Sequence, residues 1–230
     1  MNEKKRNRNH LDAHVLFGID SSFAAEHLDT MARLGVPISA GILTNPPNWS
    51  LRGVPVVLHP HEVSPLLLQS PVVLCPTTPK RRFDLHQLAV SLGFTRFVSL
   101  VDPTAIVSAR IHAGRGLFIN ANATLGSGVE LDDFVTVNRA AAIGHHTVVE
   151  RFATVGPGAT IASHCRIGQR AMIGTGAIVA PSISIGADAT VAAGAVVFRN
   201  VEEGTTVIGN PARVSRPRAD QPEAPELSQD

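Results

Sequence analysis

The chain has little cysteine, no long apolar run and almost no net charge, and each shortage excludes a class of protein. Its two cysteines, Cys75 and Cys165, lie far apart and form no C-x-x-C pair, so we expect buried thiols rather than a disulfide. No apolar run approaches the roughly 20 residues of a membrane span, and the N-terminus lacks the apolar stretch of a secretory signal. A net charge of +1 argues against a nucleic-acid surface. We therefore expect a soluble cytoplasmic protein.

The two ends of the chain differ in composition from the rest. Residues 1–13 begin with the basic stretch MNEKKRNRNH, which we expect to form a disordered arm. Residues 216–230 are rich in proline and acidic at their end, with too few apolar residues to pack, so we expect a disordered tail.

Residues 14–100 alternate between strand-like and helix-like segments. HVLFGI, VPISAGIL and SPVVLC are short apolar runs with strand character. SSFAAEHLDTMARLG and KRRFDLHQLAVSLG have apolar residues at helical spacing; both end in glycine, and the first begins with serine. Strands that alternate with helices predict a parallel sheet, so we expect a Rossmann-like α/β domain over 14–100.

From Val101 the chain follows a period of six residues without insertion as far as residue 202. The first position of each unit is aliphatic in every unit but one, where Ala113 stands, and the fifth is mostly small or aliphatic. This hexapeptide period is typical of a parallel β-helix. The first and fifth residues point inward and stack in columns from coil to coil, and the frequent glycines suit sharp turns. Three units close one coil, so residues 18 apart share a face.

The hexapeptide run resembles the left-handed β-helix acyltransferases. The segment 203–215 contains VIGNPARV, similar to the G-x-P-A-[KR] element that closes many of them. An α/β unit, an uninterrupted β-helix and GNPAR together resemble the sugar-nucleotide N-acetyltransferases, also described as sialic-acid O-acetyltransferase-like. The resemblance implies a homotrimer with acetyl-CoA between neighbouring β-helices, a nucleotide-sugar substrate held partly by the α/β domain, and a histidine base.

The resemblance also assigns the base to one histidine. Relatives carry I-N-x-x-x-x-[IV]-x-H-[DE] where this chain reads VNRAAAIGHH, so His145 matches the catalytic histidine and Asn138 the asparagine before it. His145 is the third residue of its unit and should point outward, where a neutral imidazole can accept a proton. An idle surface histidine is the alternative. His146 replaces the family's acid, which would orient the base, and it cannot supply that negative charge.

The other histidines do not suggest a metal site. His164 lies 18 residues after His146, so the two should stack, for structural or functional reasons. The γ-class carbonic anhydrases share the fold and bind zinc through three histidines, but they typically show an H-x-x-x-x-H pair. His112, His145, His146 and His164 contain no such pair. We therefore expect no metal.

Four positions match the groove that binds the acyl donor in relatives. Ser163 follows His145 by 18 residues, and Thr175 and Ala193 form a second column. Small residues there would let the pantetheine arm approach the backbone, although ordinary β-helix surface explains them equally well. Thr154 matches a position where relatives often carry a second histidine.

The phosphate-binding loop departs from the family pattern. Relatives begin with a strand and G-x-x-G-H-[GA], where this chain reads GIDSSFA. Gly18 is kept, whereas Asp20 brings a negative charge to the expected diphosphate position; Ser21 and Ser22 could cap the helix and bind an anion. The second strand ends in Thr44 and Asn45 where relatives often have acids.

Taken with the resemblance, the sequence predicts an acetyl-CoA-dependent N-acetyltransferase that acts on an amino group of a nucleotide-linked sugar in surface-glycan biosynthesis. An O-acetyltransferase, or an acyltransferase with another small-molecule acceptor, is the first alternative, motivated by the altered GIDSSFA loop. A non-catalytic β-helix scaffold is the second, motivated by the missing acid at His146.

Overall fold

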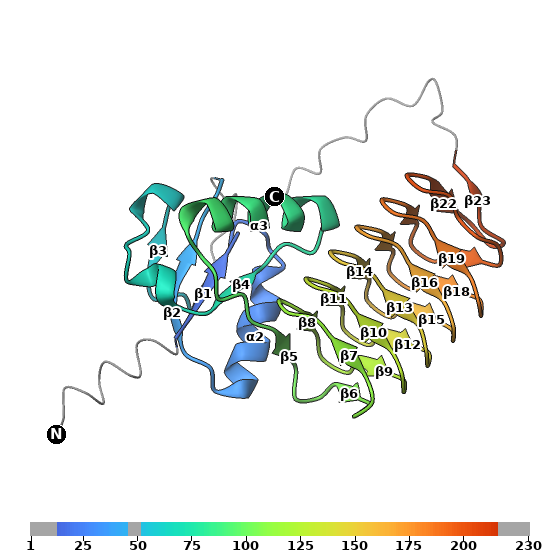
Figure 1. Ribbon diagram of the computed structural model, residues 1–230, viewed down its shortest axis with the longest axis horizontal. Coiled ribbons are helices and arrows are strands. Elements are labelled where there is room, and N and C mark those ends of the chain that lie inside the picture. Colours follow the sequence, from blue (N-terminus) through green and yellow to red (C-terminus); the bar gives the residue numbers. More distant parts are fainter. Residues whose placement is uncertain (1–12, 46–51, 216–230) are drawn as a thin grey trace.

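A computed structural model of the chain describes residues 13–45 and 52–215. The expected disordered tail, and the expected arm except for its last residue, lie outside the described residues. The described chain forms an α/β unit followed by a parallel β-helix, and the α/β unit lies against the early coils of the helix (Figure 1). Among the described helices, none is long and apolar enough to cross a membrane.

The α/β unit is built on a four-stranded parallel sheet. Its strands lie in the order β3 (Val57–Leu58), β2 (Ile38–Ile42), β1 (His14–Phe17) and β4 (Val72–Leu74). Helix α2 (Ala24–Leu34) joins β1 to β2, and α3 (Pro79–Leu92) follows β4. Two short 3₁₀ helices, η1 (Pro60–Glu62) and η2 (Leu67–Gln69), lie between β3 and β4.

The predicted helix ends are confirmed, whereas the predicted serine cap is wrong. Gly35 and Gly93 adopt the left-handed conformation after α2 and α3, and their N–H groups bond to carbonyls of the last turn. The residue at the start of α2 is Phe23, and no side chain caps it. Ser21 and Ser22 instead form the preceding turn through their carbonyls, which accept N–H groups from the first residues of α2.

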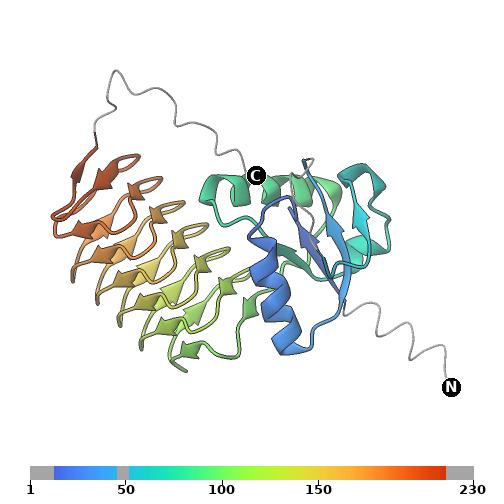
Figure 2. The same ribbon diagram turned by 180° about the vertical axis from the view of Figure 1, so that it is seen from behind.

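The β-helix has three faces, each a ladder of strands two or three residues long (Figures 1 and 2). Face 1 contains β5 (Leu100–Val101), β8 (Phe118–Ile119), β11 (Thr136–Val137), β14 (Thr154–Val155), β17 (Met172–Ile173), β20 (Thr190–Val191), β22 (Thr206–Ile208) and β23 (Arg213–Val214). Face 2 contains β6 (Ile106–Val107), β9 (Thr124–Leu125), β12 (Ala142–Ile143), β15 (Thr160–Ile161), β18 (Ile178–Val179) and β21 (Val196–Val197). Face 3 contains β7 (His112–Ala113), β10 (Glu130–Leu131), β13 (Val148–Val149), β16 (Arg166–Ile167) and β19 (Ser184–Ile185).

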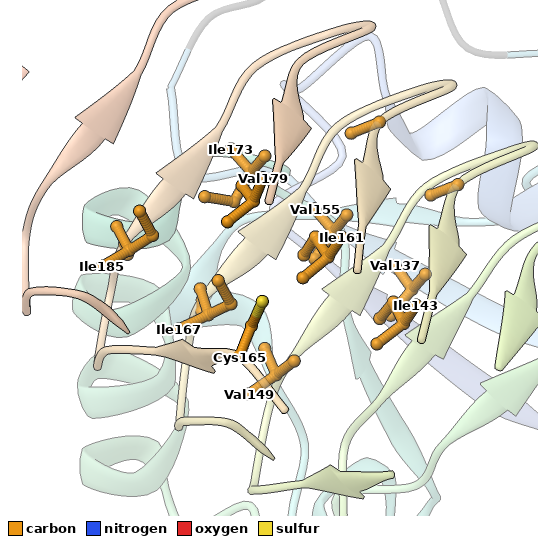
Figure 3. Packing of buried hydrophobic residues seen from close by; sticks show 14 of the residues in the cluster. Val137, Ile143, Val149, Val155, Ile161, Cys165, Ile167, Ile173, Val179 and Ile185 are labelled. Carbon is orange, nitrogen blue, oxygen red and sulfur yellow. The ribbon is translucent and has the colours of Figure 1, made fainter. Parts of the chain in front are cut away.

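The predicted 18-residue register is confirmed by the strand pairs. Ala142 pairs with Thr160 on face 2, and Thr136 pairs with Thr154 on face 1. The aliphatic first residues of the units, such as Val137, Ile143 and Val149, fill the interior (Figure 3). Cys165 lies in that interior and Cys75 in the α/β core, both as free thiols, as expected. At the end of the helix, β22 and β23 form an antiparallel hairpin across the GNPAR segment.

Glycine has two roles at the corners: it allows a left-handed turn, as the sequence predicted, and it allows successive coils to approach closely, which the sequence did not predict. Gly176 has a φ of 64° with open space around it, so it answers the demand for a left-handed turn. Gly144 needs no such conformation, but a Cβ there would lie 2.6 Å from the backbone nitrogen of Ser163 in the next coil. Close stacking of successive coils therefore explains the glycines at the second position of the unit.

The α/β unit covers part of face 1. The outward side chains of Phe118, Thr136 and Thr154 are buried there, whereas Glu130 and Arg166 on face 3 are exposed. Aromatic contacts fill this junction, including a stacked His27–Phe118 pair at 3.9 Å between ring centroids. The covered face fixes where the α/β domain sits relative to the outward residues of the coils.

Arg82 of α3 lies within this junction, 1% exposed. Its guanidinium donates hydrogen bonds to the carbonyls of Phe134 (2.9 Å) and Phe152 (2.6 Å) in the β-helix. It also donates to the Thr154 hydroxyl (3.0 Å) and to the carbonyls of Pro76, Thr77 and Ala153. Burial lowers the pKa of Arg82 to about 9, so it stays charged at neutral pH. One buried cation thus ties the two domains together.

Candidate active site

Three histidines meet at the corner between faces 2 and 3, which we call the His145 corner. His145 and His146 form the turn between β12 and β13, and His164 lies in the equivalent turn of the next coil. The His146 and His164 rings stack with an interplanar angle of 6° and centroids 5.2 Å apart, which confirms the predicted stack. The His145 ring stands edge-on to both, 5.2 Å from His146 and 5.0 Å from His164. All three side chains are exposed, so His145 points outward as predicted.

The two adjacent histidines are joined by a hydrogen bond between their Nδ1 atoms, 3.0 Å apart. One Nδ1 must therefore carry a proton and the other must offer a lone pair. If His145 donates, its Nε2 is left free to accept a proton. His146 then has the place and the accepting function that a carboxylate has in the family motif, without its charge.

The backbone holds these histidines in fixed positions. His146 and His164 have φ angles of 56° and 58°, in the left-handed region that few residues other than glycine adopt. The His146 N–H bonds to the Ser127 carbonyl, and the His164 N–H bonds to the His145 carbonyl, both at 3.0 Å. Because the coil ladder fixes both turns, only ring rotation remains to adjust the cluster.

Asn138 lies at a different corner, between faces 1 and 2, which we call the Asn138 corner. Strand β12 separates it from His145, so the two stand at opposite edges of face 2 in the chain. The side chain is 4% exposed, and its Oδ1 accepts hydrogen bonds from Asn120 Nδ2 (3.0 Å) and the Arg139 N–H (2.8 Å). The structure thus does not bring the two members of the motif together within one chain.

The Asn138 corner forms one wall of a pocket of about 270 Å³, and helix α2 forms the other. Glu26 of α2 bonds to Asn120 Nδ2 (3.1 Å) and pairs with Arg139 across this junction. Sequence reasoning missed Glu26 and Arg139, because nothing in the hexapeptide pattern marks a contact to α2. The pocket is lined by Ser22, Phe23, Ala25, Glu26, Thr77, Asn138, Arg139 and Pro157.

The four residues expected to bind the acyl donor divide into three places. Ser163 is half-buried at the His145 corner, directly one coil beyond His145. Thr175 and Ala193 are exposed and continue the Asn138 corner beyond Pro157. Thr154 is fully buried under α3, where its hydroxyl donates to the Thr77 carbonyl (2.7 Å) and accepts from Arg82. The expected contact of Thr154 with an acyl donor is therefore corrected, because the α/β domain covers it.

The loop after β1 carries a compensated charge. Gly18 turns the chain with a φ of 82°, and a Cβ there would strike the Leu85 side chain. The Asp20 carboxylate accepts a hydrogen bond from the Thr44 hydroxyl (2.8 Å) and forms an ion pair with Arg81 of α3. The negative charge that the sequence places at this edge is thus balanced by an arginine that sequence reasoning missed.

Comparison with known proteins bears out the expected resemblance. The family model described as bacterial transferase hexapeptide (six repeats) matches residues 164–199. The acetyltransferase domain of PglB from Neisseria gonorrhoeae, solved with acetyl coenzyme A, is 28% identical with a TM-score of 0.78, over 89% of this chain and 99% of that one. PerB from Caulobacter crescentus, solved with CoA and GDP-perosamine, is 27% identical with a TM-score of 0.79, over 89% and 97%.

Two further solved structures are also similar to this chain. A histidine-to-alanine mutant of the Caulobacter crescentus GDP-perosamine N-acetyltransferase is 25% identical with a TM-score of 0.80, over 89% and 97% of the two chains. WeeI from Acinetobacter baumannii, 24% identical with a TM-score of 0.78 over 88% and 99%, shares the fold. A search of curated proteins gave no match. The hexapeptide-repeat acyltransferase fold and the resemblance on which it was expected are confirmed.

Proposed function

We propose that the protein is an acetyl-CoA-dependent N-acetyltransferase that acylates an amino group on a nucleotide-linked sugar, in the cytoplasm, for surface-glycan biosynthesis. One observation carries the proposal. The exposed His145 is hydrogen-bonded through Nδ1 to His146. This pair lies on a fold that is similar, over almost the whole length of each solved protein, to PglB with bound acetyl-CoA and to PerB with bound CoA and GDP-perosamine.

In this proposal His145 is the general base. Its Nε2 accepts a proton from the amine as the amine nitrogen attacks the thioester carbonyl carbon. The carbon–sulfur bond then breaks, CoA leaves as the thiolate, and the proton on Nε2 passes to the sulfur. His146 is a positioning residue: by accepting a hydrogen bond from His145 Nδ1–H it keeps Nε2 unprotonated. Backbone N–H groups beside the thioester would stabilise the oxyanion.

The α/β unit would hold the nucleotide. Its parallel strand order and the Gly18 turn support a Rossmann-like domain, with the ligand at the carboxyl ends of the strands. Gly18, Asp20, Ser21 and Ser22 form the loop at that edge. Because Arg81 balances Asp20, the loop does not present an uncompensated negative charge to a diphosphate.

A complete site would need a second copy of the chain. Asn138 with its pocket and His145 stand at opposite edges of face 2, so an acceptor held at the pocket would meet the base of a neighbouring copy. The outward column of face 2 is uncharged and exposes Ile106 (69%) and Ile178 (45%), which suits association. We propose a homotrimer in which Ser163 of one copy, and Thr175 and Ala193 of another, line the acetyl-CoA groove.

The test is thiol release from acetyl-CoA across a panel of nucleotide-linked amino and hydroxy sugars. We expect turnover with an amino sugar, and a loss of roughly 10²-fold or more in kcat for His145→Ala. His112→Ala is the matched control, because His112 is also exposed but lies on face 3. An intact rate in His145→Ala would refute the base. Turnover confined to hydroxy sugars would favour the O-acetyltransferase, and acetyl-CoA binding without turnover would favour a scaffold.

The positioning role of His146 has its own readout. His146→Glu restores the acid of the family motif and should keep the rate, because a carboxylate also accepts a hydrogen bond from His145 Nδ1–H and stabilises the imidazolium. His146→Ala should lower kcat and leave the KM for the sugar nucleotide nearly unchanged. A loss of kcat in His146→Glu as large as that in His146→Ala would contradict the role.

A further inference from the structure

We propose that His145, His146 and His164 form a binding site for a divalent transition-metal ion of the Zn²⁺ type, and that the bound ion blocks the His145 base. The second half rests on the proposed function, whereas the binding itself does not. Sequence reasoning expected no metal, because the spacing of these histidines fits no zinc motif. The site arises from the stacking of two coils at one corner.

The geometry of the three rings carries the proposal. Each imidazole offers a ligand nitrogen, and these atoms all lie within 4.8 Å of one another. The two Nδ1 atoms of His145 and His146 are 3.0 Å apart. Two Zn–N bonds of about 2.0–2.1 Å at a tetrahedral angle place their nitrogens about 3.3 Å apart. The Nδ1 atoms of His145 and His146 are therefore nearly as far apart as two ligands of one zinc ion. Rotation of the His164 ring would bring a third ligand nitrogen to that ion.

The donor set selects the class of ion. The group formed by these described residues contains imidazoles alone. Imidazole suits zinc, copper and nickel, whereas magnesium and calcium require oxygen ligands. Three protein ligands leave a fourth position open to water. Since all three side chains are exposed, an ion can reach them from solvent.

Metal binding would disable the base through a change of tautomer. For both Nδ1 atoms to donate lone pairs to the ion, the hydrogen bond between them must break and His145 must carry its proton on Nε2. That nitrogen is the one which accepts the amine proton in the proposed mechanism. The ion and the reaction thus compete for the same neutral imidazole, and bound Zn²⁺ should inhibit acetyl transfer reversibly.

The experiment titrates the untagged chain, residues 1–230, with Zn²⁺ by calorimetry, and with Co²⁺ by visible absorption, which reports the coordination geometry. We expect one ion per chain and tetrahedral Co²⁺ bands. His164→Ala should weaken binding by about 100-fold or more, since loss of an outer-shell partner alone costs about 10- to 100-fold. His61→Ala is the matched control, because His59 and His61 form the other exposed stacked pair described, with centroids 5.7 Å apart.

Activity measured in the same chains separates the two proposals. We expect Zn²⁺ to inhibit the wild type and a chelator to restore its activity. The rate of His164→Ala, whatever its value without metal, should not change when Zn²⁺ is added. Absence of saturable binding, or binding lost in His61→Ala and kept in His164→Ala, would overturn the metal site while leaving the acetyltransferase intact. Binding that requires His164 but does not inhibit would uphold the site and refute His145 as the base.

Discussion

Replacing Arg82 by methionine tests how the two domains are joined. Methionine keeps most of the length of the side chain and removes every donor. The carbonyls of Phe134, Phe152 and Pro76 then lose a hydrogen bond inside the junction, where water reaches them poorly. Each buried acceptor left unsatisfied costs about 1–3 kcal/mol. Release from the burial of a charge offsets part of that loss, so we expect a net destabilisation of about 3–5 kcal/mol.

The assay is thermal unfolding of Arg82→Met beside Lys80→Met. Lys80 lies in the same helix turn but is 81% exposed, and among the described residues its ion pair is with Asp84 alone, so its loss should stay within about 0.5 kcal/mol. A loss of 3–5 kcal/mol corresponds to a Tm lower by about 6–20 °C in a chain of this size. Hydrogen exchange should also rise in the turns that contain Phe134 and Phe152. Equal Tm values for the two variants would refute the reasoning.

Three further predictions concern charge. Arg81→Met should raise the KM for the sugar nucleotide several-fold with little change in kcat, because it uncovers the Asp20 charge; Asp20→Asn in the same chain should restore it, as steady-state kinetics would reveal. Burial would raise the pKa of Asp102, but hydrogen bonds from Thr104, Arg33 and Thr30 outweigh it and lower the pKa to about 2. The ionised Asp102 therefore stabilises the folded state above pH 4, and this stabilisation is lost as the pH falls toward 2. Asp102→Asn should lower the free energy of unfolding by on the order of 1–2 kcal/mol at pH 7, and the urea midpoints of the variant and the wild type should converge near pH 2. Burial lowers the pKa of His27 to about 4 from 6.5, so native stability falls as pH drops through that range, and by pH 5 the loss is about 2 kcal/mol. His27→Phe should keep its Tm between pH 7 and 5 where wild type loses it, and an equal loss in both would count against the buried neutral imidazole.

The β-helix could be predicted because its constraint is local and repeated. Each unit needs an aliphatic residue at the first position, so Val137, Ile143 and Val149 mark the same column in every coil. The start of α2 was harder, because serine at a helix start is a preference that the turn after Gly18 overrides. Gly144 is required because the next coil approaches its Cα closely, but in the sequence it cannot be distinguished from a glycine required by a turn.

Features of the site that follow from the six-residue period could be predicted from the sequence, whereas features that depend on contacts with the α/β unit could not. The exposure of His145 and the stack of His146 on His164 both follow from counting residues around a coil. The burial of Thr154 does not, since its hydroxyl is covered by Arg82, which lies 72 residues away in the sequence. Contacts of such long range leave no periodic trace in one sequence, and Arg81 beside Asp20 escaped prediction for the same reason.

The fold explains how the chemistry at the His145 corner can change without loss of the scaffold. The inward columns carry the stability of the coils, whereas the side chains of His145, His146 and His164 are exposed and belong to none of the hydrophobic core clusters. A histidine in place of an acid at His146 therefore costs the core nothing, and the 18-residue repeat delivers His164 against it from the next coil. The same stacking that makes the helix rigid thus assembles three imidazoles from two turns. Competition between a proton and a metal ion at this corner follows from the stacking, because one neutral His145 cannot serve both.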